Sequence, residues 1–170
     1  MPVTPFHFGA GLAAKAAAPQ RFGLLAFCAA NVIIDVEPLY YALTRQDPLH
    51  RFFHTLPGAL IAALLTIFLF WILKTVLQWL HLSRFVVKAE ISPPGVWLGA
   101  MSGAISHVLL DSVVHADVQP FAPLTRSNPF LGWFSIFEVQ NFLTLLALAG
   151  IAGIILRSVL HRSKKAPFHE

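Results

Sequence analysis

The sequence predicts an all-α integral membrane protein, a bundle of four transmembrane helices with one short re-entrant helix before them. Of its 170 residues, 56% are hydrophobic and only 12% are charged, and the mean hydropathy is +0.69. A soluble domain of this length does not need so apolar a composition. Polar or proline-rich connections separate four long apolar runs, as expected for helices that cross a bilayer.

Each of the four apolar runs is long enough to cross about 30 Å of hydrocarbon as a helix. They cover residues 22–43, 56–82, 95–114 and 136–160. A shorter alanine-rich helix is expected over residues 5–18, because Pro5 suits a first helical turn and Pro19 ends the pattern. Its length of about 21 Å is too short to span, so we expect it to be re-entrant or interfacial. All five helices form one membrane domain.

A row of polar residues interrupts the third apolar run. His107, Asp111 and His115 are spaced four residues apart and therefore share one face of a helix. Burying such groups in hydrocarbon is costly unless they are paired or bound to a metal, so the row predicts a functional site. The alternative is a hydrogen-bonded polar seam between helices. Gly99 and Gly103 in the same run allow a neighbouring helix to approach closely.

Basic residues are divided unequally between the two sets of helix ends. One side has Arg45, Arg51 and Arg126, and the other has Lys15, Arg21, Lys74, Arg84, Lys88, Arg157, Arg162, Lys164 and Lys165. The positive-inside rule makes the more basic side, with the C-terminus, cytoplasmic. The polar groups of the first, third and fourth spans, and of the connection over residues 44–55, then fall together in the outer half of the bundle.

Imidazole nitrogens and carboxylate oxygens at one depth are a ligand set for Zn²⁺ or a similar divalent ion. The candidate ligands, enough for one or two ions, are His7, Asp35, His50, His54, His107, Asp111 and His115. His50 and His54 are four residues apart and can share a helical face. If the short helix folds back at Pro19, His7 is expected to face Asp35.

Three further residues are candidates for catalysis. Glu37 points away from Asp35 on a helix, so it is a candidate base, a group behind the ligands, or an ion-pair partner of Arg51. Glu138, at the start of the fourth span, is likewise a candidate base or a group behind the ligands. Arg51 suits a bidentate contact with an anionic substrate, or serves topology alone. With metal-activated water, this set favours hydrolysis of a phosphate ester, such as that of a small molecule or a lipid headgroup.

Four sequence pieces resemble the YdjM type of bacterial membrane-bound metal-dependent hydrolases, which are likened to zinc-dependent phospholipases C. They are residues 4–7 (TPFH), 34–37 (IDVE), 50–55 (HRFFHT) and 106–111 (SHVLLD), with His115 and Pro123 downstream. The resemblance implies a helical inner-membrane protein with metal ligands at His7, Asp35, His50, His54, His107 and Asp111. Ile34 replaces a proline common in such families, and Phe52 and Phe53 stand where a glycine is common.

Other functional classes are disfavoured or remain as alternatives. The basic residues lie at segment ends rather than on one face, so no nucleic-acid partner is expected. The single cysteine, Cys28, excludes an intrachain disulfide and a cysteine-rich zinc module. Two alternatives to a hydrolase remain: a non-enzymatic metal-binding or ion-transporting membrane protein, and a structural bundle with a satisfied polar seam.

Overall fold

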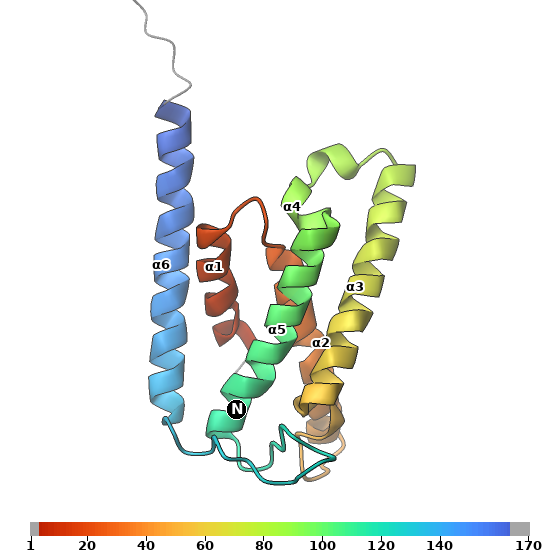
Figure 1. The fold of residues 1–170 in the computed structure, drawn as a ribbon, viewed down its shortest axis with the longest axis vertical. Coiled ribbons are helices and arrows are strands. Elements are labelled where there is room, and N and C mark those ends of the chain that lie inside the picture. Colours follow the sequence, from red (N-terminus) through yellow and green to blue (C-terminus); the bar gives the residue numbers. More distant parts are fainter. Residues whose placement is uncertain (1–3, 164–170) are drawn as a thin grey trace, which may run out of the picture.

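The computed structural model describes residues 4–163, and every regular element in that range is helical (Figure 1). The longer elements are α1 (Phe8–Ala17), α2 (Leu24–Leu43), α3 (Leu56–Trp79), α5 (Pro93–Val114) and α6 (Ile136–Ser163). The short ones are η1 (Thr4–Phe6), η2 (Phe52–His54), η3 (Ser83–Phe85) and α4 (Lys88–Ile91). Lys164 and Lys165 of the basic tail lie outside the described residues.

Four of these helices are long and apolar enough to cross a membrane: Leu24–Leu43, Leu56–Trp79, Pro93–Val114 and Ile136–His161. They confirm the predicted helical membrane bundle. The third span begins before residue 95, the predicted start, because Pro93 and Pro94 occupy its first turn, where no backbone donor is needed. Ser92 caps that turn by accepting a hydrogen bond from the Gly95 N–H. Residues 83–94, predicted as a connection between two spans, contain η3, α4 and the first residues of α5.

Helices α2 and α5 pack closely because glycines line their contact. A Cβ atom at Gly99 would lie 2.1 Å from the carbonyl oxygen of Gly23, and one at Gly103 would lie 2.6 Å from that of Phe27. Helix α3 joins the pair through Ala59, Ala62 and Ala63, which are fully buried. The three helices form an apolar core that holds the polar end of α5 in a fixed position.

Helix α6 is attached to the bundle mainly through the short helix α1, which lies beside it (Figure 1). A Cβ atom at Gly9 would lie 2.0 Å from the Leu143 carbonyl oxygen, so the two backbones touch. Gly150 makes a similar contact with Leu12. This packing fixes α1 beside the core and places its preceding residue, His7, inside the protein, where only 2% of it is exposed.

The C-terminal ends of α2 and α5, the N-terminal end of α3 and the connection over residues 115–135 lie at the same end of the molecule (Figure 1). The connection is tied to the helices by hydrogen bonds. The Leu56 N–H donates to the Pro120 carbonyl oxygen over 2.8 Å, and Asn128 Nδ2 donates to the Ser112 carbonyl oxygen over 2.7 Å. We call this end of the bundle the histidine end.

Candidate metal centre

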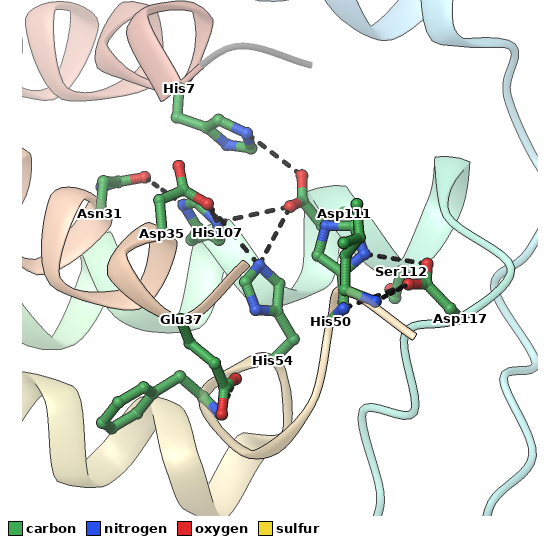
Figure 2. A network of polar contacts seen from close by, with 12 residues as sticks. His7, Asn31, Asp35, Glu37, His50, His54, His107, Asp111, Ser112 and Asp117 are labelled. Carbon is green, nitrogen blue, oxygen red and sulfur yellow. Dashed lines mark hydrogen bonds and ion pairs between the residues drawn. The ribbon is translucent and has the colours of Figure 1, made fainter. Parts of the chain in front are cut away.

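The histidine end contains a cluster of imidazoles and carboxylates that come from separate parts of the chain: the residue before α1, helix α2, residues 50–54 and the end of α5 (Figure 2). Two overlapping groups have ligand atoms that all lie within 4.8 Å of one another. The first group is Asp35, His54, His107 and Asp111, and the second is His50, Asp111 and His115. Asp111 belongs to both groups, so the cluster is continuous around its carboxylate.

The first group has the spacing of a tetrahedral site. His107 Nε2 lies 3.2 Å from Asp35 Oδ1 and 3.4 Å from Asp111 Oδ2. His54 Nε2 lies 3.4 Å from Asp111 Oδ2 and 3.8 Å from Asp35 Oδ1. Ligand atoms about 2.1 Å from a zinc ion, at the corners of a tetrahedron, are about 3.4 Å apart. The four measured separations lie on both sides of that value, so these residues fit a single ion.

Asn31 fixes which nitrogen of His107 faces the cluster. The Asn31 Nδ2 group donates to the Phe27 carbonyl oxygen over 2.8 Å, which turns Oδ1 toward His107. His107 Nδ1 therefore donates to Asn31 Oδ1 over 3.0 Å and carries the ring proton. In the neutral ring, Nε2 then presents a lone pair to two carboxylates, an arrangement that needs a cation between them.

A carboxylate orients His50 in the second group. His50 Nδ1 donates to Asp117 Oδ1 over 2.9 Å, while the backbone N–H groups of Leu49 and His50 both donate to Asp117 Oδ2 over 3.1 Å. This leaves Nε2 of His50 free of the proton and available to an ion. The His50 ring lies 4.5 Å, centroid to centroid, from the rings of both His54 and His115.

Buried nitrogen and oxygen atoms of the cluster lack hydrogen-bond partners among the residues that the structure describes. They are both ring nitrogens of His7, both of His54, Nε2 of His107 and of His115, and Oδ1 of Asp111. Leaving so many buried polar atoms unsatisfied would be expensive. One divalent ion would balance the charges of Asp35 and Asp111 and use neutral imidazole lone pairs, so the donor set fits a metal.

A family model described as YdjM inner membrane protein matches residues 1–168, nearly the whole chain. The chain belongs to this family. No curated protein and no solved structure gives a significant match. The family match agrees with the four membrane-spanning helices and identifies the chain as a membrane protein.

The structure joins His7 of this YdjM family member to the cluster through Asp111 and His107. His7 Nε2 lies 3.2 Å from Asp111 Oδ1, and its ring stacks on His107 with centroids 4.4 Å apart. The prediction that His7 also faces Asp35 stays a prediction. The close packing of Gly9 on α6 sets the rotation of α1, and this rotation directs His7 to α5.

Two predicted helical pairings are wrong, although their residues do enter the cluster. His50 precedes the short η2 turn, so it does not share a helical face with His54. Helix α5 ends at Val114, and His115 has extended backbone angles, with φ −109° and ψ 121°. Its N–H still donates to the Asp111 carbonyl oxygen over 2.8 Å, which keeps the imidazole next to the helix end.

Glu37 supports the histidine-bearing turn rather than an ion pair. Its carboxylate accepts hydrogen bonds from the backbone N–H groups of Phe52 and Phe53, over 3.1 and 2.8 Å. These bonds hold η2, and with it His54, against α2. Among the described residues, Glu37 and Arg51 form no ion pair. Glu37 therefore satisfies donors at the start of η2 that have no partner within that turn.

Arg51 and Glu138, the other two candidates for catalysis, lie outside both candidate metal groups. The Arg51 guanidinium stacks on the Tyr41 ring at 3.7 Å from its centroid, and its Nε donates to the Pro48 carbonyl oxygen over 3.0 Å. Glu138 is exposed and accepts from the N–H and hydroxyl of Ser135 at the start of α6. That contact is a capping box.

The protonation of the groups outside the spans favours metal binding. Burial lowers the pKa of His54 and of His115, because an imidazolium is costly away from water. Burial alone would raise the pKa of Asp117. Hydrogen bonds from His50 have the larger, opposite effect, so the pKa of Asp117 is below its usual value. Neutral imidazoles with an ionised carboxylate behind them are the forms that ligate a metal.

Sequence reasoning missed the roles of two residues. Asn31 was visible only as a polar residue inside an apolar span, and Asp117 as one acid in a proline-rich connection. The spacing of Asn31 four residues before Asp35, on the same helical face, is a signal that was available. Asp117 has no comparable signal, because its partner lies 67 residues earlier in a loop.

Proposed function

We propose that the protein is a membrane-bound hydrolase that binds one or two divalent ions, of the zinc type, and cleaves a phosphate ester. The observation that carries the proposal is the set of four separations of 3.2–3.8 Å that join ring nitrogens of His54 and His107 to carboxylate oxygens of Asp35 and Asp111. Asp35, His54, His107 and Asp111 would hold the first ion. His50, His115 and Asp111 would hold the second.

A bound ion of this kind lowers the pKa of a coordinated water and polarises a phosphoryl oxygen. The protein's own residues supply orientation. Asn31 and Asp117 fix the tautomers of His107 and His50, and Glu37 holds the turn that carries His54. Because hydrogen bonds restrain the rings of His107 and His50 and the turn that carries His54, these ligands are oriented before a substrate arrives.

A cavity of about 390 Å³ adjoins the second group and offers room for a substrate. His50 and Asp117 line one part of it, and Arg51 and Gln119 line another. Stacking on Tyr41 and bonding to Pro48 hold the Arg51 guanidinium in place. A fixed guanidinium beside a metal-ligating histidine suits the binding of a phosphate group, in a small molecule or a lipid headgroup.

The histidine end is proposed to face the outer side of the bacterial inner membrane, with the C-terminus cytoplasmic. Arg45, Arg51 and Arg126 belong to the connections at this end. Arg21, Arg84 and Lys88 belong to the connections at the opposite end. In a Cys28→Ser background, Arg126→Cys should react with an impermeant maleimide added to intact cells, and Arg84→Cys should not. The reverse labelling would overturn the orientation.

Ion transport receives less support from the interior of the bundle. Between the two ends, α2, α3 and α5 meet through a buried core that includes Ala26, Ala30, Ala62, Ala100 and Ala104. Within the described residues, buried polar groups near this core, such as Thr66, bond to their own helix. A conducting path needs polar groups at successive depths, so an enclosed site is favoured over a pathway.

The proposal is tested on detergent-purified protein with a phosphate monoester, a phosphate diester and anionic phospholipid vesicles. We expect metal-dependent hydrolysis of at least one probe, lost after chelation, restored by Zn²⁺ and absent in Asp111→Asn. Arg51→Gln should raise KM more than it lowers kcat, and the exposed Glu138→Gln is the control that should change neither. Metal-loaded protein that hydrolyses none of the three probes would overturn the proposed reaction.

A further inference from the structure

The end of the bundle opposite the histidine end contains an apolar cavity that the proposed function does not use. It has a volume of about 400 Å³ and lies between α3 and the start of α5. Leu64, Phe68 and Trp71 line it on α3, and Val96 and Trp97 line it on α5. Trp71 and Trp97 are 63% and 50% exposed, so the cavity is open at the surface of the spans.

The cavity exists because the contact between α3 and α5 changes character along its length. Toward the histidine end, α3 presents Ala59, Ala62 and Ala63 to the core, and the helices pack closely. Toward the other end, its lining residues include Phe68 and Phe70, whose rings do not allow the same approach. The change from alanine to aromatic side chains along α3 therefore leaves a groove between α3 and α5.

A basic cavity of about 520 Å³ continues this groove at the helix ends. The two cavities share Lys74, Ile91 and Pro93, and the second adds Arg84 and Lys88. In the part of the chain that the structure describes, no carboxylate forms an ion pair with any of these three cations. Lys15, at the same end, is in contrast paired with Glu90. Three cations therefore surround the mouth of an apolar groove without a countercharge.

We propose that this groove binds an anionic phospholipid, with the phosphate at Lys74, Arg84 and Lys88 and an acyl chain along the α3–α5 cavity. The charges complement a lipid phosphate, and the apolar lining begins where the cations end. Basic pockets between transmembrane helices bind anionic headgroups, and each cation near a membrane surface strengthens such binding about fivefold. Exposed tryptophans beside the groove are typical of the membrane interface. The proposed site is separate from the metal centre.

The test compares two lipids of the same chain length on the purified full chain. Native mass spectrometry of protein delipidated in detergent should show tighter binding of phosphatidylglycerol than of phosphatidylcholine. The double variant Lys74→Gln/Lys88→Gln should weaken phosphatidylglycerol binding about tenfold or more and leave phosphatidylcholine unchanged. Arg21→Gln/Arg157→Gln is the matched control, because it removes two cations from the same end outside the groove.

A second variant tests the apolar part of the site. Leu64→Trp places a larger ring on an exposed lining position of the groove and leaves all three cations in place. It should also weaken phosphatidylglycerol binding, and melting curves should show that every variant remains folded. Equal binding of the two lipids, or equal losses in the two double variants, would overturn the proposal. Loss in the cation variant without loss in Leu64→Trp would overturn the assignment of the acyl chain to the groove.

Discussion

Both ends of the bundle bury ionisable side chains, but the two ends differ in how far the polar atoms of these side chains are hydrogen-bonded. At the basic end, Glu90 is 7% exposed and both of its carboxylate oxygens are used. One pairs with Lys15, and the other accepts from the Leu25 N–H over 2.8 Å. Lys15 also donates to the Phe22 carbonyl oxygen over 2.8 Å. At the histidine end, the Nε2 atoms of His7, His54 and His107 lie 3.2–3.4 Å from the Asp111 carboxylate, yet none of these nitrogens has a hydrogen-bond partner among the described residues.

This difference separates a structural use of buried charge from a functional one. Lys15 and Glu90 satisfy each other and the backbone at the start of α2, so they need nothing from outside the chain. The histidine end differs, because several of its buried ring nitrogens and one carboxylate oxygen of Asp111 have no hydrogen-bond partner among the described residues. Incomplete buried groups persist where a ligand completes them, and the following predictions test whether the two ends differ in this way.

The largest effect is expected from Asp111→Asn. Asp111 contributes to both candidate metal groups, so loss of its charge should reduce bound metal by about tenfold or more at both. Elemental analysis of purified protein measures the change. Glu90→Gln is the matched control at the basic end and should retain the wild-type metal content. Equal metal loss in the two variants would remove the distinction between the ends.

Glu90→Gln should instead reduce stability. It leaves the Lys15 ammonium buried with only a neutral partner, and breaking a buried ion pair costs about 3 kcal/mol. Chemical unfolding in detergent micelles measures the loss. Lys15→Met/Glu90→Leu, which replaces the pair by apolar groups, should recover most of it. A double variant less stable than Glu90→Gln would show that the ion pair stabilises the fold by more than neutralising its own two buried charges.

A smaller effect is expected from Asn31→Ala. The variant removes the acceptor of the His107 ring proton, so the ring is no longer held in one tautomer. Loss of such a partner typically lowers metal affinity by about 10-fold to 100-fold. Competition with a chromophoric chelator measures the affinity. Asn141→Ala makes the same replacement at an exposed position of α6 and should not change it.

The smallest effect is expected from Asp117→Asn, because His50 is the one candidate ligand to which Asp117 is hydrogen-bonded among the described residues. Affinity should fall about tenfold for the second ion and remain unchanged for the first. A two-step zinc titration resolves the two. Asp47→Asn, at an exposed position of the loop that carries His50, is the control. Simultaneous weakening of both steps would mean that the two groups do not bind ions separately.

The fold was predictable because length and hydropathy decide it. Four apolar runs gave the four spans, and a run too short to span gave α1. The gathering of distant polar groups at one end was predictable from the order of the spans. The rotation of each helix about its axis was not predictable. The contact of His7 with Asp111 depends on how Gly9 packs against α6, and the sequence pattern of α1 does not indicate this packing.

Loop geometry also limited what the sequence could predict for the site. His50 and His54 have helical spacing, yet only Phe52–His54 forms a turn of helix. The reason is the carboxylate of Glu37, which accepts from two successive N–H groups and stabilises that tight turn. A contact between a side chain and a distant backbone leaves no pattern in the sequence. The residue types of the cluster were therefore predictable, and the paths that bring them together were not.

The most direct test of the incomplete histidine end is the metal content of the purified wild-type chain beside His54→Ala and His107→Ala, with melting temperatures recorded before and after chelation. The account predicts one or two divalent ions per wild-type chain, a lower melting temperature after chelation, and loss of metal in both variants. A polar seam without metal predicts variants that lose stability with no change in metal content. Wild-type protein that is folded, free of metal and insensitive to chelation would contradict the account.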